Sequence, residues 1–472
     1  MSSPDTASVG SVDARIGTGN VQMDSVLCGG FPVNSLNIIM GQPGTGKTIF
    51  AEQLVFHHAV EDDRPILYLT TLSEPVAKVL TYLQRFTFFD EDKIGSTVVY
   101  QDIGPDLAKS GVDALLPHIV DAIHTVSPKI IVIDSFKALH DLASSAQEMR
   151  RMLHELTSTL AAYEVTVFLV GEYTDDHART LPEFAVADGI VQFLRNPQST
   201  RDERFVRVLK LRGSRYQEGL HGCRITAAGL DVYPRLVTPD LPEDYMVNSE
   251  RISTGVPGFD DIVGGGIMRG STTVVAGATG TGKTTMCLQF ALESLRQKER
   301  CLFVNFQENP PQLARVIKNM GIDPGQAQEQ GLELLYTSPV ELQIDSIIVK
   351  LFSTVSTKKI DRVVIDAIGD LGRATTDQYR LHDYLYSLIQ HFTVRGVTSF
   401  LTYETVGKLT EMGGNTMSLT QLSNISDNIV LLELGQEPDY DRTGRCLKSR
   451  GSKHDLKPHK LEMSDKGLSF LK

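Results

Sequence analysis

The sequence predicts an α/β fold of two tandem copies of one domain, each with a mostly parallel sheet flanked by helices. Motifs near the start of the chain recur 236 residues later. In each copy, short apolar runs alternate with amphipathic stretches of helical period. A glycine-rich loop stands between a predicted strand and a predicted helix in both copies. Strands that alternate with helices favour parallel pairing, with helices on both faces of the sheet.

The repeat sets the expected domain boundaries. Residues 15–19 (RIGTG) match residues 251–255 (RISTG), and residues 41–48 match residues 277–284 at the same offset. A period of this length indicates a duplicated domain rather than a solenoid of short units. Residues 238–244 contain two prolines and three acidic residues, which is typical of a linker. We expect a flexible N-terminus over residues 1–14, a first domain over 15–235, a linker over 236–250 and a second domain over 251–472.

The elements of the first copy follow from its hydrophobic periodicity. The expected strands are the apolar runs 36–40, 66–70, 129–134 and 165–170. The expected helices are the amphipathic stretches 47–58, 76–86, 111–126 and 149–163. Residues 205–211 alternate between apolar and polar side chains, which predicts an antiparallel extension of the sheet.

Composition excludes several classes of protein. The chain has 472 residues, 41% hydrophobic and 22% charged, which indicates a globular protein rather than a disordered one. The net charge of −12 disfavours a protein whose main function is to bind the phosphate backbone of a nucleic acid. The five scattered cysteines predict no disulfide framework and no zinc site. No apolar run approaches the ~20 residues of a membrane span, and the N-terminus lacks the features of a signal peptide. We therefore expect a cytoplasmic protein.

The two glycine loops predict nucleotide binding. Residues 41–48 (GQPGTGKT) and 277–284 (GATGTGKT) match G-x-x-x-x-G-K-[ST] in full. In this motif, backbone N–H groups surround phosphates, the lysine contacts the β- and γ-phosphates, and a hydroxyl binds Mg²⁺. One match alone also fits an ordinary loop, whereas two matches in register favour two nucleotide sites. The predicted nucleotide-binding residues are Gly41, Gly44, Thr45, Gly46, Lys47 and Thr48 in the first copy, and Gly277, Thr279, Gly280, Thr281, Gly282, Lys283, Thr284 and Thr285 in the second.

An aspartate ends a buried apolar strand in each copy, Asp134 in the first and Asp366 in the second. Such an aspartate helps to hold Mg²⁺ in P-loop enzymes, although aspartate is also a good helix N-cap. A P-loop lies upstream at a similar separation in both copies, which favours the metal role. We expect ATP and Mg²⁺ at both sites, with Thr48 and Asp134 as metal ligands in the first copy and Thr284 and Asp366 in the second.

Several motifs together resemble those of the KaiC family, within the RecA/RadA group of ring-forming ATPases. They are the opening R-I-x-T-G, the glycine pairs at 29–30 and 265–266, and the late K-x-R-G motifs at 210–213 and 448–451. The resemblance spans residues 15–470. It implies two tandem RecA-like P-loop NTPase domains that assemble as a hexameric double ring, with ATP between neighbouring subunits.

On this resemblance, basic residues of the late motifs reach the ATP of the adjacent protomer. They are Lys210 and Arg212 in the first copy, and Lys448 and Arg450 in the second. An arginine supplied across an interface stabilises charge on the phosphoryl group being transferred. Without the resemblance, the same residues also fit a solvated strand edge.

The sequence departs from the family pattern where KaiC proteins carry a Glu-Glu pair after the second strand. The first copy has Leu72 and Ser73 at these positions, with Glu74 one step further on. The second copy has Gln307 followed by Glu308. Because a carboxylate orients the nucleophile and accepts its proton, whereas glutamine is a very poor base, we expect slow chemistry in the second copy. In the first we expect binding without efficient turnover. Glu74 fits a displaced base, although an acidic residue that satisfies a helix N-terminus is the favoured interpretation.

A second departure concerns the family's autophosphorylation sites, which are adjacent hydroxyl residues in the second domain. Residues 421–427 (QLSNISD) place Ser423 at the first acceptor position and Asn424 at the second. This predicts at most single-site phosphorylation at Ser423, whose hydroxyl also fits a purely structural hydrogen bond. Clock members carry a longer C-terminal tail than this chain, which ends at Lys472. A KaiC-like ATPase of signalling or stress responses is therefore favoured over a clock oscillator.

The leading hypothesis is a ring-forming KaiC-like ATPase with Ser/Thr autokinase activity in its second domain. We expect a homohexamer, a regulatory protein partner, and no membrane or nucleic-acid partner. A RadA- or DnaB-like motor on single-stranded DNA is the alternative from another class, but it needs basic pore loops that the sequence does not provide. A third hypothesis is an assembly scaffold gated by ATP, with weak turnover.

Overall fold

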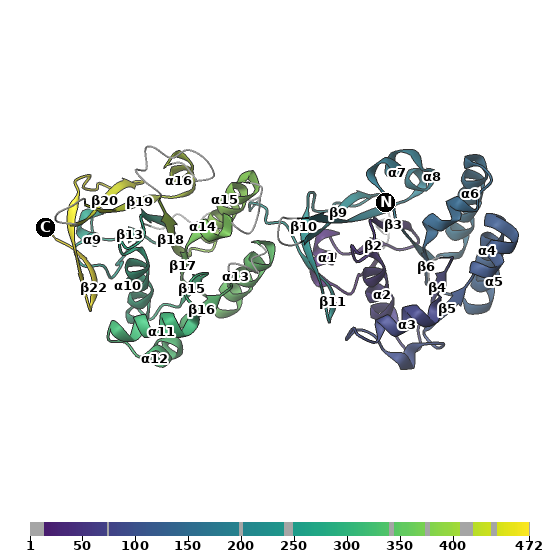
Figure 1. The fold of residues 1–472 in the computed structure, drawn as a ribbon, viewed down its shortest axis with the longest axis horizontal. Helices are drawn as coiled ribbons and strands as arrows, with labels where there is room; N and C mark the ends of the chain where they lie inside the picture. Colours follow the sequence, from purple (N-terminus) through teal and green to yellow (C-terminus); the bar gives the residue numbers. More distant parts are fainter. Residues whose placement is uncertain are drawn as a thin grey trace, which may run out of the picture. The chain divides into compact units, whose positions relative to one another are not determined.

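The computed structural model of the chain describes residues 14–72, 75–197, 202–239, 249–338, 344–372, 378–405, 419–435 and 441–471. The chain forms two compact units, Met1–Arg235 and Leu236–Lys472, which run from purple to teal and from teal to yellow in Figure 1. The expected N-terminal segment, except for Ala14, and residues 240–248 of the expected linker lie outside the described residues.

The described part of the first unit contains a nine-stranded sheet in the order β11-β10-β9-β8-β3-β7-β6-β4-β5. The six strands from β8 to β5 are parallel, and β9, β10 and β11 extend the sheet in antiparallel pairing. The parallel strands are β3 (Leu36–Gly41), β4 (Ile66–Thr70), β5 (Val98–Asp102), β6 (Ile130–Asp134), β7 (Thr166–Gly171) and β8 (Gly189–Pro197). The antiparallel strands are β9 (Asp202–Leu211), β10 (His221–Thr226) and β11 (Gly229–Tyr233). A small ribbon of β1 (Arg15–Ile16) and β2 (Phe31–Pro32) stands apart from this sheet.

Helices cover both faces of this sheet (Figure 1). One core cluster packs α2 against one face, and a second packs α5 and α6 against the other. All six residues of β3 are buried, because central parallel strands have both faces covered. The helices are α1 (Val21–Val26), α2 (Lys47–His58), α3 (Val76–Leu83), α4 (Gly104–Ser110), α5 (Leu115–Val126), α6 (Ala146–Tyr163), α7 (Asp175–Thr180) and α8 (Pro182–Val186), with 3₁₀ turns η1 (Glu91–Lys93), η2 (Gly111–Ala114) and η3 (Phe136–Asp141).

The second unit repeats the same topology, with the order β16-β15-β17-β18-β14-β19-β20-β21-β22 in its described part. The P-loop strand β14 corresponds to β3, and β17 and β18 correspond to β6 and β7. The strands are β12 (Arg251–Ile252), β13 (Ile267–Met268), β14 (Thr272–Gly277), β15 (Cys301–Asn305), β16 (Leu332–Tyr336), β17 (Arg362–Asp366), β18 (Thr398–Glu404), β19 (Asn428–Leu434), β20 (Arg442–Ser449), β21 (His459–Ser464) and β22 (Gly467–Phe470). The helices are α9 (Phe259–Ile262), α10 (Lys283–Arg296), α11 (Pro310–Asn319), α12 (Pro324–Gln330), α13 (Ile344–Lys358), α14 (Ile368–Leu371), α15 (Gln378–Val394) and α16 (Leu419–Ile425).

The predicted fold class is confirmed, with differences at the ends of elements. The helix expected over 111–126 is divided into η2 and α5. The helix expected from 149 starts at Ala146, because the Ser145 hydroxyl accepts a hydrogen bond from the Glu148 N–H and caps the helix there. The antiparallel extension expected over 205–211 is longer, since β9 begins at Asp202 and two further strands follow. No described helix is long and apolar enough to cross a membrane.

The topology brings the nucleotide motifs to one edge of each sheet. In the first unit, β7 lies between the P-loop strand β3 and the strand β6 that ends in Asp134. Because these strands are parallel, their carboxyl ends meet at the same edge, where open α/β sheets bind ligands. The second unit places β18 between β14 and β17 in the same way.

Candidate nucleotide-binding sites

The two P-loops have the same internal geometry. In the first, the Lys47 ammonium and the Thr45 hydroxyl both donate to the Gln42 carbonyl, at 2.9 and 2.8 Å. In the second, Lys283 and Thr281 donate to the Ala278 carbonyl at the same two distances. Each loop ends in a glycine with a left-handed backbone, φ 104° before α2 and 105° before α10, which an L side chain adopts only with strain. The helix N-terminus that follows favours anions.

A threonine and an aspartate meet behind each P-loop. The Thr48 hydroxyl donates to Asp134 Oδ2 at 2.9 Å, and the Thr284 hydroxyl donates to Asp366 Oδ2 at 2.7 Å. The two partners of each pair come from different elements more than 80 residues apart, 86 in the first unit and 82 in the second. A hydroxyl and a carboxylate side by side supply the oxygen ligands that Mg²⁺ prefers, so the residues present fit this ion.

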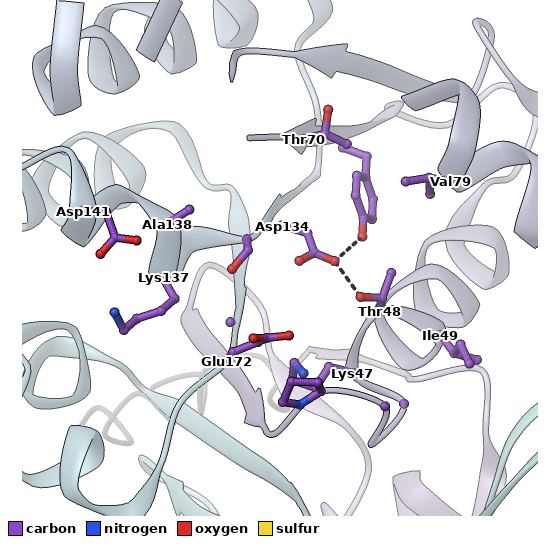
Figure 2. A pocket seen from close by; sticks show the side chains of 16 residues that line it. Lys47, Thr48, Ile49, Thr70, Val79, Asp134, Lys137, Ala138, Asp141 and Glu172 are labelled. Atoms are coloured by element: carbon purple, nitrogen blue, oxygen red, sulfur yellow. Dashed lines mark hydrogen bonds between the residues drawn. The ribbon is translucent and has the colours of Figure 1, made fainter. Parts of the chain in front are cut away.

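A cleft opens above each pair. The first has a volume of about 560 Å³ and the second about 360 Å³. Figure 2 shows the first cleft, with Asp134 bonded to Thr48 and Lys47 on the P-loop below. Of the predicted site residues, those that line the first cleft are Gly44, Gly46, Lys47, Thr48 and Asp134, and those that line the second are Thr279, Gly280, Gly282, Lys283, Thr284, Thr285, Gln307, Glu308 and Asp366. Thr45 and Thr281 are buried within their loops, and Gly41 and Gly277 end the P-loop strands.

Electrostatics in the clefts act on the P-loop lysines. Burial lowers the pKa of Lys47, and the negative charges of Glu172 and Asp134 oppose this effect. Burial also lowers the pKa of Lys283, where Glu404 and Asp366 oppose it. Each lysine therefore faces two carboxylates.

The late basic motifs lie outside the clefts of their own domains. Lys210 donates to two carbonyls at the end of α8, each at 3.2 Å, and Arg212 contacts Asp188 at 3.3 Å. Lys448 donates to the carbonyls of Ser423 and Ser426, each at 2.6 Å. Arg450 lies 3.6 Å from Asp427, with 65% of its side chain exposed. The motif thus ties β9 or β20 to a short helix in each unit, and its role toward a neighbouring protomer stays a prediction.

Comparison with known proteins agrees with this geometry. A family model described as the KaiC ATPase matches residues 16–237 and 252–472. The chain belongs to the KaiC ATPase family. The circadian clock oscillator protein KaiC 1 of Synechocystis sp. is 28% identical over 456 residues, covering 94% of this chain and 86% of that protein. The circadian clock oscillator protein KaiC of Synechococcus elongatus is 27% identical over 486 residues, covering 99% of this chain and 91% of that protein. This KaiC-family ATPase therefore carries one P-loop site in each of two tandem domains.

In the second domain, the position of the family's Glu-Glu pair lies in the cleft. The Gln307 side-chain amide donates to Asp370 Oδ2 at 2.9 Å. One oxygen of Glu308, Oε2, is buried and has no hydrogen-bond partner in the described part of the chain. Burial raises the pKa of Glu308, and the negative charge of Asp366 adds to this effect. A carboxylate with a raised pKa accepts a proton more readily near neutral pH.

In the first domain, the corresponding position lies only partly within the described residues. Leu72 is described and 47% exposed, whereas Ser73 and Glu74 lie outside the described residues. The candidate phosphoacceptor Ser423 lies on α16, half-buried, and is not among the residues that line the second cleft. The role of Ser423 stays a prediction.

Two glutamates that line the clefts were not predicted from the sequence. Glu172 directly follows β7, and Glu404 ends β18. Each lines the cleft of its domain beside the P-loop lysine. Aligning the two copies along these strands reveals the pair, because both glutamates fall at the same position relative to Thr166 and Thr398.

Asp134 and Asp366 each accept a hydrogen bond from a second hydroxyl group, which differs between the domains and which the sequence did not predict. In the first domain the Tyr68 hydroxyl donates to Asp134 Oδ2 at 3.0 Å. In the second domain the Thr402 hydroxyl donates to Asp366 Oδ1. Each hydroxyl is present in one domain only. Phe303 in β15 occupies the position of Tyr68, and valine in β7 occupies the position of Thr402.

Proposed function

We propose that the protein binds Mg-ATP at both P-loops and hydrolyses it slowly. The observation that carries this proposal is the pairing of Thr48 with Asp134 and of Thr284 with Asp366 behind two P-loops of matching geometry. In each site these two side chains would hold Mg²⁺, which neutralises charge on the phosphates when bound. Lys47 and Lys283 would contact the β- and γ-phosphates together with backbone N–H groups.

In the second site, Glu308 is the proposed general base. Its carboxylate orients the attacking water and accepts a proton from it. Gln307 positions the loop through Asp370 but does not take the proton. With one carboxylate in place of two, turnover at this site is slow.

The experiment that tests this function compares Lys47→Ala with Lys283→Ala. Each variant should lose one of two bound ATP molecules per chain, and Glu308→Gln should lower phosphate release from the second site by about 10²-fold or more. Two intact ATP sites without any phosphate release would contradict the ATPase and favour the assembly scaffold gated by ATP.

We further propose a homohexameric double ring with domains over 15–235 and 251–472, in which Lys210, Arg212, Lys448 and Arg450 reach the ATP of the neighbouring subunit. Family membership supports this arrangement, as does the position of the late motifs outside their own clefts. The binding of a regulatory protein would depend on the nucleotide bound to the ring. The protein would act in the cytoplasm, where ATP and Mg²⁺ are abundant. Light scattering with and without Mg-ATP tests the ring, and a monomer under both conditions would contradict it.

Autophosphorylation of Ser423 is the remaining proposal for the second domain. It is supported by the position of Ser423 on α16, whose C-terminal turn binds Lys448. Incubation with Mg-ATP should add one phosphate to the intact mass of the parent and of Ser426→Ala, but none to Ser423→Ala. An unchanged parent mass would contradict the autokinase.

A further inference from the structure

We propose that Glu172 is the general base that activates water at the first nucleotide site. This inference rests on the proposed ATP hydrolysis and adds a carboxylate at the site where the family's Glu-Glu pair is missing. It assigns to the first domain a turnover that Leu72 and Ser73 alone would not support.

The topology places Glu172 in the first cleft, beside the P-loop lysine. Glu172 follows β7, and β7 runs between the P-loop strand β3 and the strand β6 that ends in Asp134. Its side chain is exposed to the cleft, and Figure 2 shows its carboxylate beside Lys47. Glu172 is also the charge with the largest influence on the Lys47 ammonium. Since that lysine binds the β- and γ-phosphates in P-loops, the carboxylate faces the phosphorus that water attacks.

The corresponding glutamate of the second domain is held by the P-loop. The Thr279 hydroxyl donates to Glu404 Oε1. The first P-loop has Pro43 at the position of Thr279, and proline has neither a hydroxyl nor an N–H group to donate. Within the described residues, Glu172 has no hydrogen bond and no ion pair. The exchange of threonine for proline therefore leaves this carboxylate available for water.

Among the described residues, the other acidic groups near the first cleft are less suited to this role. Asp134 already accepts hydrogen bonds from Thr48 and Tyr68 and belongs to the proposed metal site. Glu52 is fully buried and accepts a hydrogen bond from Tyr100 at 2.6 Å. Asp141 also lines the cleft, but it lies on η3 and Figure 2 shows it away from Thr48 and Lys47.

The reaction step balances with water and ATP alone. The water oxygen forms a bond to the γ-phosphorus while one water proton passes to a Glu172 carboxylate oxygen. The bond between the γ-phosphorus and the bridging oxygen breaks, and its electron pair remains on ADP. The proton then leaves Glu172 to phosphate or solvent, which restores the carboxylate.

The test uses the full chain with the second site disabled by Lys283→Ala, so that all remaining turnover belongs to the first site. Glu172→Gln is introduced in this background, and Asp176→Asn is the matched control. Asp176 lies four residues further on, and its side chain is 90% exposed. Both variants replace a carboxylate by the corresponding amide. ATP binding is measured by equilibrium dialysis, and phosphate release is measured in single-turnover reactions with labelled ATP.

We expect Glu172→Gln to lower the rate of phosphate release by about 10²-fold or more, the usual contribution of a general base. ATP binding should be unchanged or tighter, because a negative charge next to the phosphates is removed. Asp176→Asn should behave like the parent. Glu172→Asp, which keeps a carboxylate at a greater distance, should retain more activity than Glu172→Gln.

Three results would overturn the assignment. Glu172→Gln could release phosphate as fast as its parent, or it could lose ATP binding together with hydrolysis, which would make Glu172 a support of the P-loop. The Lys283→Ala parent could also bind ATP and release no phosphate, which would leave the first site without a base. Failure of the proposed function is a different result, in which the chain with both P-loop lysines and Glu172 intact binds no ATP, or binds it and releases no phosphate from either site.

Discussion

The buried carboxyl of Glu52 predicts that the first domain loses stability as the pH rises. Glu52 lies on α2, one turn after Thr48, and is completely buried. One of its oxygens accepts a hydrogen bond from Tyr100, and the other, Oε1, has no hydrogen-bond partner among the residues that the structure describes. Burial raises the pKa of Glu52 from its ordinary value of 4.5 to about 8, although the Tyr100 hydrogen bond opposes this effect. The second domain has Leu288 at the equivalent position.

The sign and size of the effect follow from this pKa. Above pH 4.5 the unfolded chain loses the Glu52 proton, whereas the folded domain keeps it until about pH 8. Stability therefore falls with pH across this interval, by about 1.36 kcal/mol per pH unit. Between pH 6 and pH 8 the loss amounts to about 2 kcal/mol, and the whole interval to about 5 kcal/mol. Glu52→Gln removes this titration while keeping the shape of the protonated carboxyl.

Hydrogen exchange with mass spectrometry measures this effect within the full chain. The opening free energy of peptides from α2 is compared between pH 6 and pH 8, after correction for the pH dependence of the chemical exchange rate. We expect the parent to lose about 2 kcal/mol of protection and Glu52→Gln to lose much less. Peptides from α10, which has leucine at the equivalent position, provide an internal control. Equal pH slopes in the parent and in Glu52→Gln would refute the reasoning.

Three further predictions concern substitutions at individual residues. Tyr68→Phe should weaken Mg²⁺-dependent nucleotide binding at the first site about 10-fold or more and leave the second site unchanged, because partners that orient a metal ligand contribute on this scale. Thr402→Val should weaken the second site and leave the first unchanged. Equal effects of either variant on both sites in dialysis experiments would contradict this. Arg362→Met should lower the free energy of unfolding by about 3–5 kcal/mol, because the fully buried guanidinium donates a hydrogen bond to Glu299 at 2.6 Å. An unchanged midpoint of urea unfolding would refute this prediction. Gly282→Ala should lower the opening free energy of α10, measured by hydrogen exchange, by about 1–2 kcal/mol, because the backbone φ at this residue is 105°. An unchanged exchange rate in α10 would show that the backbone relaxes without cost.

The sequence was sufficient for the features encoded in local motifs. The P-loops, the strands that end in Asp134 and Asp366, and the duplication of the domain all depend on short runs of residues with a physical signature. Their meeting at the edge of the sheet follows from parallel pairing, which the alternation of strands and helices already favours.

The residues that were missed carry no local signature. Glu172 is a single acidic residue after a strand, and its place in the cleft depends on β7 running between β3 and β6, which the sequence does not encode locally. Glu52 lies in a helix at a position where a buried carboxylate is unexpected, since such a group is costly without partners. In the sequence, Tyr68 resembles any aromatic residue of a buried strand. Only the structure shows that its hydroxyl donates a hydrogen bond to Asp134.

The number of ATP molecules bound per chain tests the central proposal most directly. Equilibrium dialysis with labelled ATP and Mg²⁺ should give two for the parent, one for Lys47→Ala and one for Lys283→Ala, because each P-loop lies beside its own threonine–aspartate pair and would hold one ATP. A parent that binds only one ATP, or a lysine variant that still binds two, would contradict two functional P-loop sites in this KaiC-family protein.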